Sequence, residues 1–199
     1  MEKINLVALI LFILFISLYL GKLLLLYRKN KINANVLGKG KKNKKIKLIE
    51  RLVKIATFLW GFAWVIESIL GDKIDEYIPY LYTNAIVRWI GIVIIFIGVI
   101  IFGVAAFSMR TSWRVGIDKN TKTELVTDGI YRYSRNPAFL GFDTMFTGIF
   151  IVFPNLITLG TMIISMISIH LLILQEEKHL IESFGDGYRI YKGNTSRYI

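Results

Sequence analysis

Long runs without a charged residue are the feature that most limits how this chain can fold. The stretch 89–109 contains no charged side chain, and between residues 138 and 175 the only one is Asp143. An α-helix of about 20 apolar residues crosses the ~30 Å hydrocarbon core of a bilayer, and a soluble core of this size has no use for so much apolar surface. These runs predict an all-α integral membrane protein.

Five apolar segments are expected to be transmembrane helices. The first is predicted to be a retained anchor, because its weak basic n-region and the lack of a small-residue cleavage site argue against a signal peptide. Pro154 and Asn155 interrupt the last long run and indicate a turn, so this run, residues 138–175, is predicted to be a helical hairpin. The predicted spans are residues 4–26, 52–70, 86–107, 138–153 and 156–175.

Lys and Arg are unevenly distributed over the connecting segments. Residues 27–51 carry ten of them, residues 108–136 carry six, and the tail from residue 176 carries four. Because Lys and Arg accumulate in cytoplasmic loops, the N-terminus is predicted outside and the C-terminus in the cytoplasm. The lysine block 38–47 could also bind anionic lipid headgroups, although topology alone accounts for it.

Composition narrows the chemistry that the chain can carry. The net charge of +11 does not indicate nucleic-acid binding, because the basic residues lie beside apolar spans, where topology explains them. The chain has no Cys and only two His, so neither a thiolate nucleophile nor a metal site is predicted. Any chemistry must use carboxylates, Arg, Tyr, Asn or a bound cofactor.

Charged and aromatic residues are concentrated immediately before the hairpin, in residues 124–137. An interfacial belt of Tyr and basic residues would explain the residue types but not their density. Asp128 and Gly129 form a turn at which backbone amides can approach a ligand closely, and Arg135 lies beside a helix N-terminus that also favours an anion. The segment could therefore bind a polyanionic or zwitterionic ligand.

Glu176 and Glu177 follow the hairpin as an adjacent pair of carboxylates. At a helix C-terminus such a pair opposes the helix dipole, which suggests a function, although a solvated acidic edge beside Lys178 is an equally good explanation. One carboxylate could bind an ammonium group or a ribose hydroxyl while the other orients Arg135. At 1.5 Å per residue, the depths of Pro137 and Glu176 differ by only ~6 Å, which places both motifs at the same rim.

Two further features belong to the candidate site, and one polar residue within the spans lies outside it. The tail, residues 184–199, is predicted to be an amphipathic interfacial helix, whose Gly185 permits a tight turn over a neighbouring site. Asp143 and His170 lie within the hairpin and could line an acceptor cavity or make an internal helix contact. Glu67, near the outer end of the second span, is interpreted as interfacial.

Together these segments resemble the isoprenylcysteine carboxyl methyltransferase family and the wider group of membrane methyltransferases that includes phospholipid N-methyltransferases. The resemblance covers about residues 110–199. It rests on Leu125, Val126, Gly129, Tyr131, Arg135, Asn136, Pro137, Glu176, Glu177, Leu180, Phe184, Gly185, Tyr188, Tyr191 and Arg197. Two departures leave the acceptor open: Asn136 stands where carboxyl methyltransferases usually have His, and an apolar residue at or near Leu172 replaces an Arg that suits a substrate carboxylate.

The resemblance implies a cytoplasmic site for S-adenosyl-L-methionine and a lipophilic acceptor from the bilayer, either an isoprenylcysteine-type carboxylate or a lipid amine. Residues 1–107 would then be membrane helices with a polybasic loop at 27–51, and residues 108–199 the catalytic region. The implied cofactor pocket consists of Leu125, Val126, Gly129, Tyr131, Asn136, Pro137, Glu176 and Tyr188, with Leu125 and Val126 against the adenine and Glu176 at the polar end. The implied charged, catalytic lining is Arg135, Glu177 and Arg197.

Two other functions compete with a methyltransferase. Sterol-type membrane reductases have a similar scaffold and bind NADPH, but its phosphates would meet the acidic pair and too few basic residues. A non-catalytic adaptor that holds anionic lipid through the lysine block would leave the clustered motifs unexplained.

The distribution of Lys and Arg predicts that the lysine block and the tail share one side of the membrane. Because the natural chain has no Cys, the single variants Asn43→Cys and Asn194→Cys can be labelled separately with a membrane-impermeant maleimide. We expect both thiols to react from the cytoplasmic side. Labelling from opposite sides would show that the five-span topology is wrong.

Overall fold

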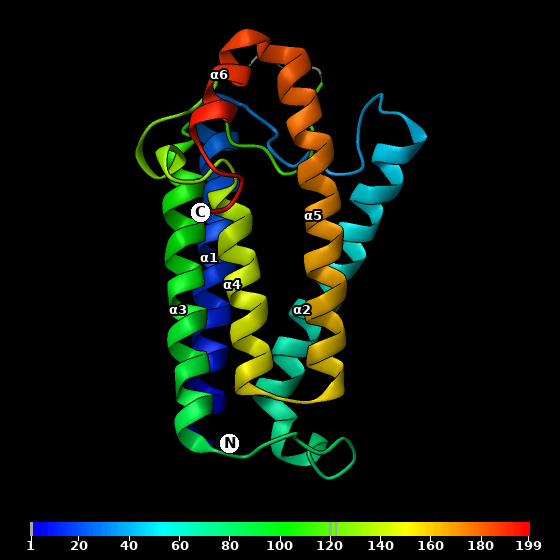
Figure 1. Cartoon of the computed structure of the whole chain (residues 1–199). Coiled ribbons are helices and arrows are strands. Elements are labelled where there is room, and N and C mark those ends of the chain that lie inside the picture. Colours follow the sequence, from blue (N-terminus) through cyan, green and yellow to red (C-terminus); the bar gives the residue numbers. More distant parts are fainter. Residues whose placement is uncertain (1, 120, 122) are drawn as a thin grey trace.

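The fold is a bundle of long helices, seen in the computed structural model, which describes residues 2–119, 121 and 123–199 (Figure 1). The helices are α1 (Lys3–Asn30), α2 (Lys44–Ile74), α3 (Ala85–Ser108), α4 (Pro137–Val152), α5 (Leu156–Phe184) and α6 (Asp186–Asn194), with a 3₁₀ turn, η1 (Gly129–Arg132), before α4. In the described residues, β pairing is limited to one isolated parallel bridge between Asn35 and Val115. The predicted all-α class is confirmed.

Four helices, α1, α2, α3 and α5, are long and apolar enough to cross a membrane. The shorter helix α4 is also apolar, but it has 16 residues, about 24 Å at 1.5 Å per residue. Helices long and apolar enough to span a bilayer are therefore confirmed for four of the five predicted segments. The assignment of α4 as a fifth span stays a prediction.

The hairpin turn lies where the sequence predicts it, but α5 is longer than expected. The side chain of Asn155 caps α5 by accepting hydrogen bonds from the backbone of Ile157 and Thr158. The helix then continues beyond residue 175 to Phe184 and ends where Gly185 adopts a positive φ of 55°. The predicted end of this helix was wrong, because loss of hydrophobicity ends a membrane span without ending the helix.

Glycines allow α3 and α4 to pack closely along their length. A Cβ atom added at Gly98 would lie 2.8 Å from the carbonyl oxygen of Gly141, and one added at Gly141 would lie 2.9 Å from the carbonyl oxygen of Gly98. Seven residues along each helix, a Cβ added at Gly148 would lie 3.0 Å from the carbonyl oxygen of Gly91, and one added at Gly91 would lie 2.9 Å from the backbone nitrogen of Val152. Small residues at such contacts permit close backbone approach in membrane helices.

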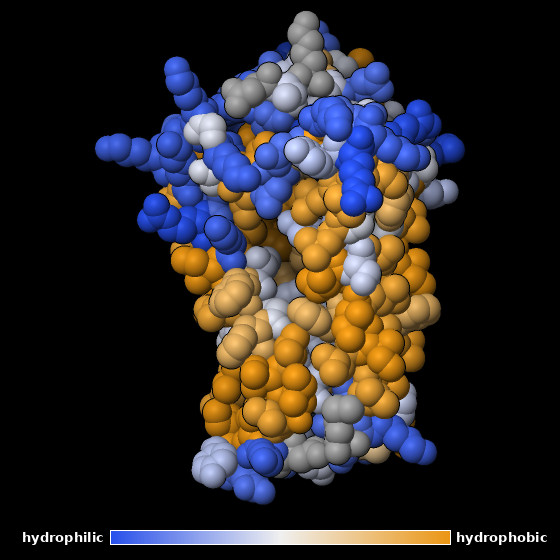
Figure 2. Space-filling model, turned by 180° about the vertical axis from the view of Figure 1, so that it is seen from behind, coloured by the Kyte–Doolittle hydropathy of each residue, from blue (hydrophilic) through white to orange (hydrophobic). Residues whose placement is uncertain are grey.

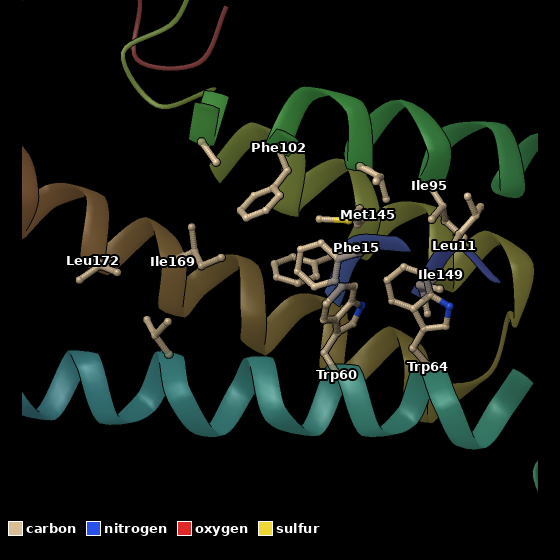
Figure 3. Close-up of a cluster of buried hydrophobic side chains, with 14 of the residues drawn as sticks. Leu11, Phe15, Trp60, Trp64, Ile95, Phe102, Met145, Ile149, Ile169 and Leu172 are labelled. Atoms are coloured by element: carbon tan, nitrogen blue, oxygen red, sulfur yellow. The ribbon is translucent and has the colours of Figure 1, made fainter. Parts of the chain in front are cut away.

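Aromatic side chains fill the middle of the bundle (Figure 3). The ring of Phe15 on α1 meets the ring of Phe102 on α3 edge-on at 5.2 Å, and Trp60 on α2 meets Phe146 on α4 at 4.7 Å. The buried indole of Trp64 donates a hydrogen bond of 3.0 Å to the carbonyl oxygen of Ala8. These contacts connect α2 to α1 and α4 across the bundle.

Buried polar groups join the helices at the end of the bundle that holds the N-terminus. Arg88 donates hydrogen bonds to Glu2 and to the carbonyl oxygen of Val152. Glu67 is only 1% exposed and accepts a hydrogen bond of 2.6 Å from Asn155 in the hairpin turn. The interfacial interpretation of Glu67 was therefore wrong, because the hairpin turn covers this carboxylate.

The close approach of α3 and α4 predicts that Gly141→Ala destabilises the protein. The added methyl group has to displace the backbone of α3, so we expect the free energy of unfolding to fall by about 1 to 3 kcal/mol. Gly160→Ala on α5 is the matched control, since nothing lies within 4 Å of its added Cβ. Thermal unfolding in detergent compares the two variants. Equal stability of both would contradict the close packing of this seam.

Candidate active site

A cavity of about 980 Å³ runs from the described residues of the segment 109–126 and from α6 into the space between α1, α2, α4 and α5. Figure 2 shows a hollow on the face opposite to that of Figure 1, where the hydrophilic end of the molecule meets the apolar band. The cavity therefore combines a polar end with an apolar end.

The two ends of the cavity differ in chemistry. The apolar end is lined by Phe12, Phe15, Trp60, Phe102, Phe142 and Ile169. The polar end is lined by Arg114, Asp118, Lys119, Glu124, Glu176 and His179. Large clefts with an apolar lining and a few convergent polar groups are typical of small-molecule sites.

Residues from the segment before the hairpin and from the segment after it meet in this cavity. Its lining includes Leu125, Val126, Tyr131, Arg135, Asn136, Glu176 and Tyr188, all of which the sequence analysis placed in the site. Gly129 and Pro137 are absent from the lining. Gly129 begins η1 with a positive φ of 59°, and Pro137 is at the first turn of α4, so both shape the backbone around the cavity.

Glu177 joins α5 to the segment before α4 and to the C-terminal tail. Its side chain is 5% exposed, and its Oε1 accepts hydrogen bonds of 2.9 Å from both Arg135 and Arg197. Arg197 also donates to Oε2 at 3.0 Å, and these hydrogen bonds raise the pKa of Arg197 above its ordinary value. Glu177 and Arg197 therefore hold Arg135 in place and do not themselves line the cavity.

The tail lies over the site and is not merely an interfacial helix. The backbone N–H of Arg135 donates to the carbonyl oxygen of Ser196 at 3.0 Å, and the side chain of Asn136 donates to the carbonyl oxygen of Arg197 at 3.1 Å. On α6, the hydroxyl of Tyr191 donates to the carbonyl oxygen of Tyr131 at 2.6 Å. The turn at Gly185 lets α6 cross the end of the bundle and make these contacts (Figure 1).

Several polar groups of the cavity-lining residues have no protein partner among the described residues, and two of them belong to Tyr188 and Glu176. The buried hydroxyl of Tyr188 has no hydrogen-bond partner, and the carboxylate of Glu176 forms no hydrogen bond or salt bridge with any residue that the structure describes. Burial, with the Glu177 charge as the next cause, raises the pKa of Tyr188 to about 12. At neutral pH this hydroxyl is protonated, so the cavity offers a hydrogen-bond donor and a carboxylate acceptor to a ligand.

Asp143 and His170 lie beside the tail and do not line the cavity. The ring Nδ1 of His170 is 2.9 Å from the hydroxyl of Tyr198. One carboxylate oxygen of Asp143 is buried without a hydrogen-bond partner among the described residues. The pKa of Tyr198 is raised above its ordinary value, mainly by burial and next by the charge of Asp143. Their role in an acceptor cavity remains a prediction.

Several lining residues were missed by the sequence analysis. Phe12, Phe58 and Trp60 come from α1 and α2, where aromatic residues facing a cavity look the same as those facing lipid or core. His179 follows Glu176 by three residues on α5 and also lines the cavity. Residues three apart share a helix face, so this spacing could have identified His179.

Residues 86–187 match the family model described as phospholipid methyltransferase. The match covers just over half of the chain, from α3 to the start of α6, and this chain belongs to the phospholipid methyltransferase family. No curated protein matches the sequence. Membership in this family, together with four helices able to cross a bilayer, identifies an integral membrane methyltransferase and favours this class over the reductase and adaptor alternatives.

The cluster around Glu177 predicts a large loss of stability in Glu177→Gln. The amide removes the charge that compensates Arg135 and Arg197, so we expect the free energy of unfolding to fall by about 3 kcal/mol, as for a broken buried ion pair. Chemical denaturation in detergent measures the change. In the control variant Glu182→Gln, the carboxylate is 54% exposed and 3.9 Å from Lys119, and we expect a change below about 0.5 kcal/mol. Similar losses in both variants would contradict the role of Glu177.

Proposed function

We propose that the protein transfers the methyl group of S-adenosyl-L-methionine to a lipophilic acceptor that enters from the bilayer. The observation that carries this proposal is one cavity in which the unpaired polar groups of Glu176 and Tyr188 face one end and aromatic rings line the other. A polar cofactor and an apolar acceptor require such a division. The family membership supports the methyl transfer itself.

The residues at the polar end fit the cofactor group by group. Leu125 and Val126 offer an apolar surface for the adenine, and the carboxylate of Glu176 suits an ammonium group or ribose hydroxyls. The buried Nε of Arg135 has no partner among the described residues and suits a carboxylate, while Tyr188 offers a hydroxyl donor. These groups match a zwitterionic ligand better than a phosphate-rich one such as NADPH.

When bound, S-adenosyl-L-methionine supplies a methyl group on a sulfonium. The acceptor takes this methyl group in an in-line displacement, in which the sulfur leaves as a neutral thioether. The contribution of the chain is to orient the acceptor and to exclude water. Arg135 is held rigidly by Glu177 at 2.9 Å, so it does not need to reorganise when a ligand binds. We propose that Glu177 and Arg197 serve catalysis through Arg135. A carboxylate acceptor needs no base, whereas an amine acceptor must first lose a proton.

The cavity volume leaves room for an acceptor beside the cofactor. About 980 Å³ lies at the upper limit of single-ligand pockets, which are roughly 300 to 1,000 Å³. The aromatic end extends between α1 and α2, where Phe58 and Phe62 line the cavity and are 70% and 57% exposed on the outer surface. We propose that the acceptor enters between these two helices.

We further propose that the polar end of the cavity faces the cytoplasm. The lysine block and the tail lie at this end of the bundle, and their Lys and Arg content is typical of cytoplasmic segments. Five spans, with α4 as a short span packed on α3, would place the N-terminus outside.

The proposed site predicts that Glu176→Gln binds S-adenosyl-L-methionine more weakly. Loss of a charge-assisted hydrogen bond should weaken binding by about 1.5 to 3 kcal/mol, and the fold should persist because Glu176 has no protein partner among the described residues. Asn136→Ala should weaken binding as well, since Asn136 lines the cavity and holds the tail. Isothermal titration calorimetry in detergent measures both variants.

The control for these variants is Lys44→Ala, whose side chain is exposed at the start of α2 and away from the cavity lining. It should bind like the wild type. Wild-type affinity in both Glu176→Gln and Asn136→Ala would show that these motifs do not form the cofactor pocket. Tight binding of NADPH by the wild type, without binding of S-adenosyl-L-methionine, would overturn the proposed function.

A further inference from the structure

Glu50, near the start of α2, is a fully buried carboxylate whose acceptor sites are all used. Lys42 donates to its two oxygens at 2.7 and 2.9 Å, and the backbone N–H groups of Gly38 and Ile117 donate at 2.8 and 2.9 Å. The exposed fraction of Glu50 is 0%. Because a carboxylate has about four acceptor sites, this side chain is saturated by donors from two separate segments.

The two segments pair with each other next to Glu50. The N–H of Val36 donates a hydrogen bond of 3.0 Å to the carbonyl oxygen of Val115. The N–H of Val115 in turn donates one of 2.8 Å to the carbonyl oxygen of Ala34. Gly116 has a positive φ of 90°, and a Cβ there would lie 2.8 Å from the Cα of Leu37. Residues 34–38 and 113–117 therefore form a tightly packed patch, which we call the paired wall.

The paired wall borders the polar end of the cavity. Leu37, Val115, Gly116 and Ile117 all line it, and the chain beyond Ile117 leads to Leu125 and Val126. The position of Ile117 is thus tied to the segment that offers an apolar surface to the cofactor. Removing the wall would open this end of the cavity to water.

The lysine block contains two kinds of lysine. Lys44 and Lys47 are exposed, as a topological signal requires. The side chain of Lys42 is 3% exposed and bridges Glu50 to the carbonyl oxygen of Val36 at 2.8 Å. Lys is almost never buried unless it is paired, so topology does not account for Lys42.

We propose that Glu50 is a positioning residue for the cofactor site, and that it acts by holding the paired wall closed. This inference rests on the proposed function. It extends the site to a part of the chain outside residues 86–187, which are the ones that match the family model. Lys42 assists by neutralising Glu50 and by holding Val36.

The first test compares Glu50→Gln with the wild type. The amide places an NH₂ group against the donors of Lys42, Gly38 or Ile117, so the wall should loosen. We expect S-adenosyl-L-methionine to bind about tenfold more weakly, the effect of losing one hydrogen bond to a charged group. Calorimetry on the full chain in detergent measures the affinity.

The second readout needs no cofactor. Ala34 is 1% exposed, and the chain has no Cys, so a thiol at Ala34→Cys reports opening of the wall. We expect Glu50→Gln in this background to react with a maleimide about tenfold faster than Ala34→Cys alone, because opening has become easier by that factor. Lys44→Met should change neither affinity nor labelling rate.

The double variant of Lys42→Met with Glu50→Gln serves in case Glu50→Gln alone does not fold, because it removes both buried charges together. It still loses the hydrogen bonds that Lys42 donates to Glu50 and to Val36, so we expect about tenfold weaker binding and faster labelling in the same proportion. Wild-type affinity and labelling rate in the folded variants would overturn the role of Glu50 while leaving the proposed function intact. Failure of the wild type to bind S-adenosyl-L-methionine would instead overturn the proposed function.

Discussion

The site depends on one buried carboxylate, that of Glu177, shared by two guanidinium groups. Arg135 precedes α4, Glu177 is on α5 and Arg197 is in the tail, so this cluster joins three segments that are far apart in the sequence. Each charge would be costly to bury alone, and together they compensate one another. This cluster fixes Arg135 at the cavity and places the tail and α6 over its polar end.

The cavity exists because the helices pack unevenly. Facing glycines such as Gly98 and Gly141 bring α3 and α4 together at backbone contact. Large rings, among them Phe102, Phe142 and Trp60, cannot interdigitate as closely, and they line the space between α4, α2 and α1. Because α3 and α4 pack closely while the aromatic rings keep α4, α2 and α1 further apart, an apolar cavity remains, and it continues into a polar one. Such a passage suits the polar donor and the lipophilic acceptor that we propose.

Much of the fold was predictable from local physics. Uncharged apolar runs require helices in a bilayer, and Pro154 with Asn155 breaks the last run into the hairpin that the structure shows. Counting residues on either side of this turn put Pro137 and Glu176 at one rim, and the side chains of their neighbours Arg135 and Glu177 are 2.9 Å apart. Helix ends were less predictable, because α5 continues to Phe184 on hydrogen bonds that hydrophobicity does not report.

The sequence by itself determined the membrane helices, the hairpin and the set of residues around the site. Tertiary structure alone decided how far each charged residue is buried and which partners it has. Glu176 faces the cavity while Glu177 is bound by two Arg, although they are adjacent in one motif. Lys42 is buried on Glu50 while Lys44 is exposed, although both belong to one lysine block. Burial and partners are set by segments distant in the chain, which local patterns cannot encode.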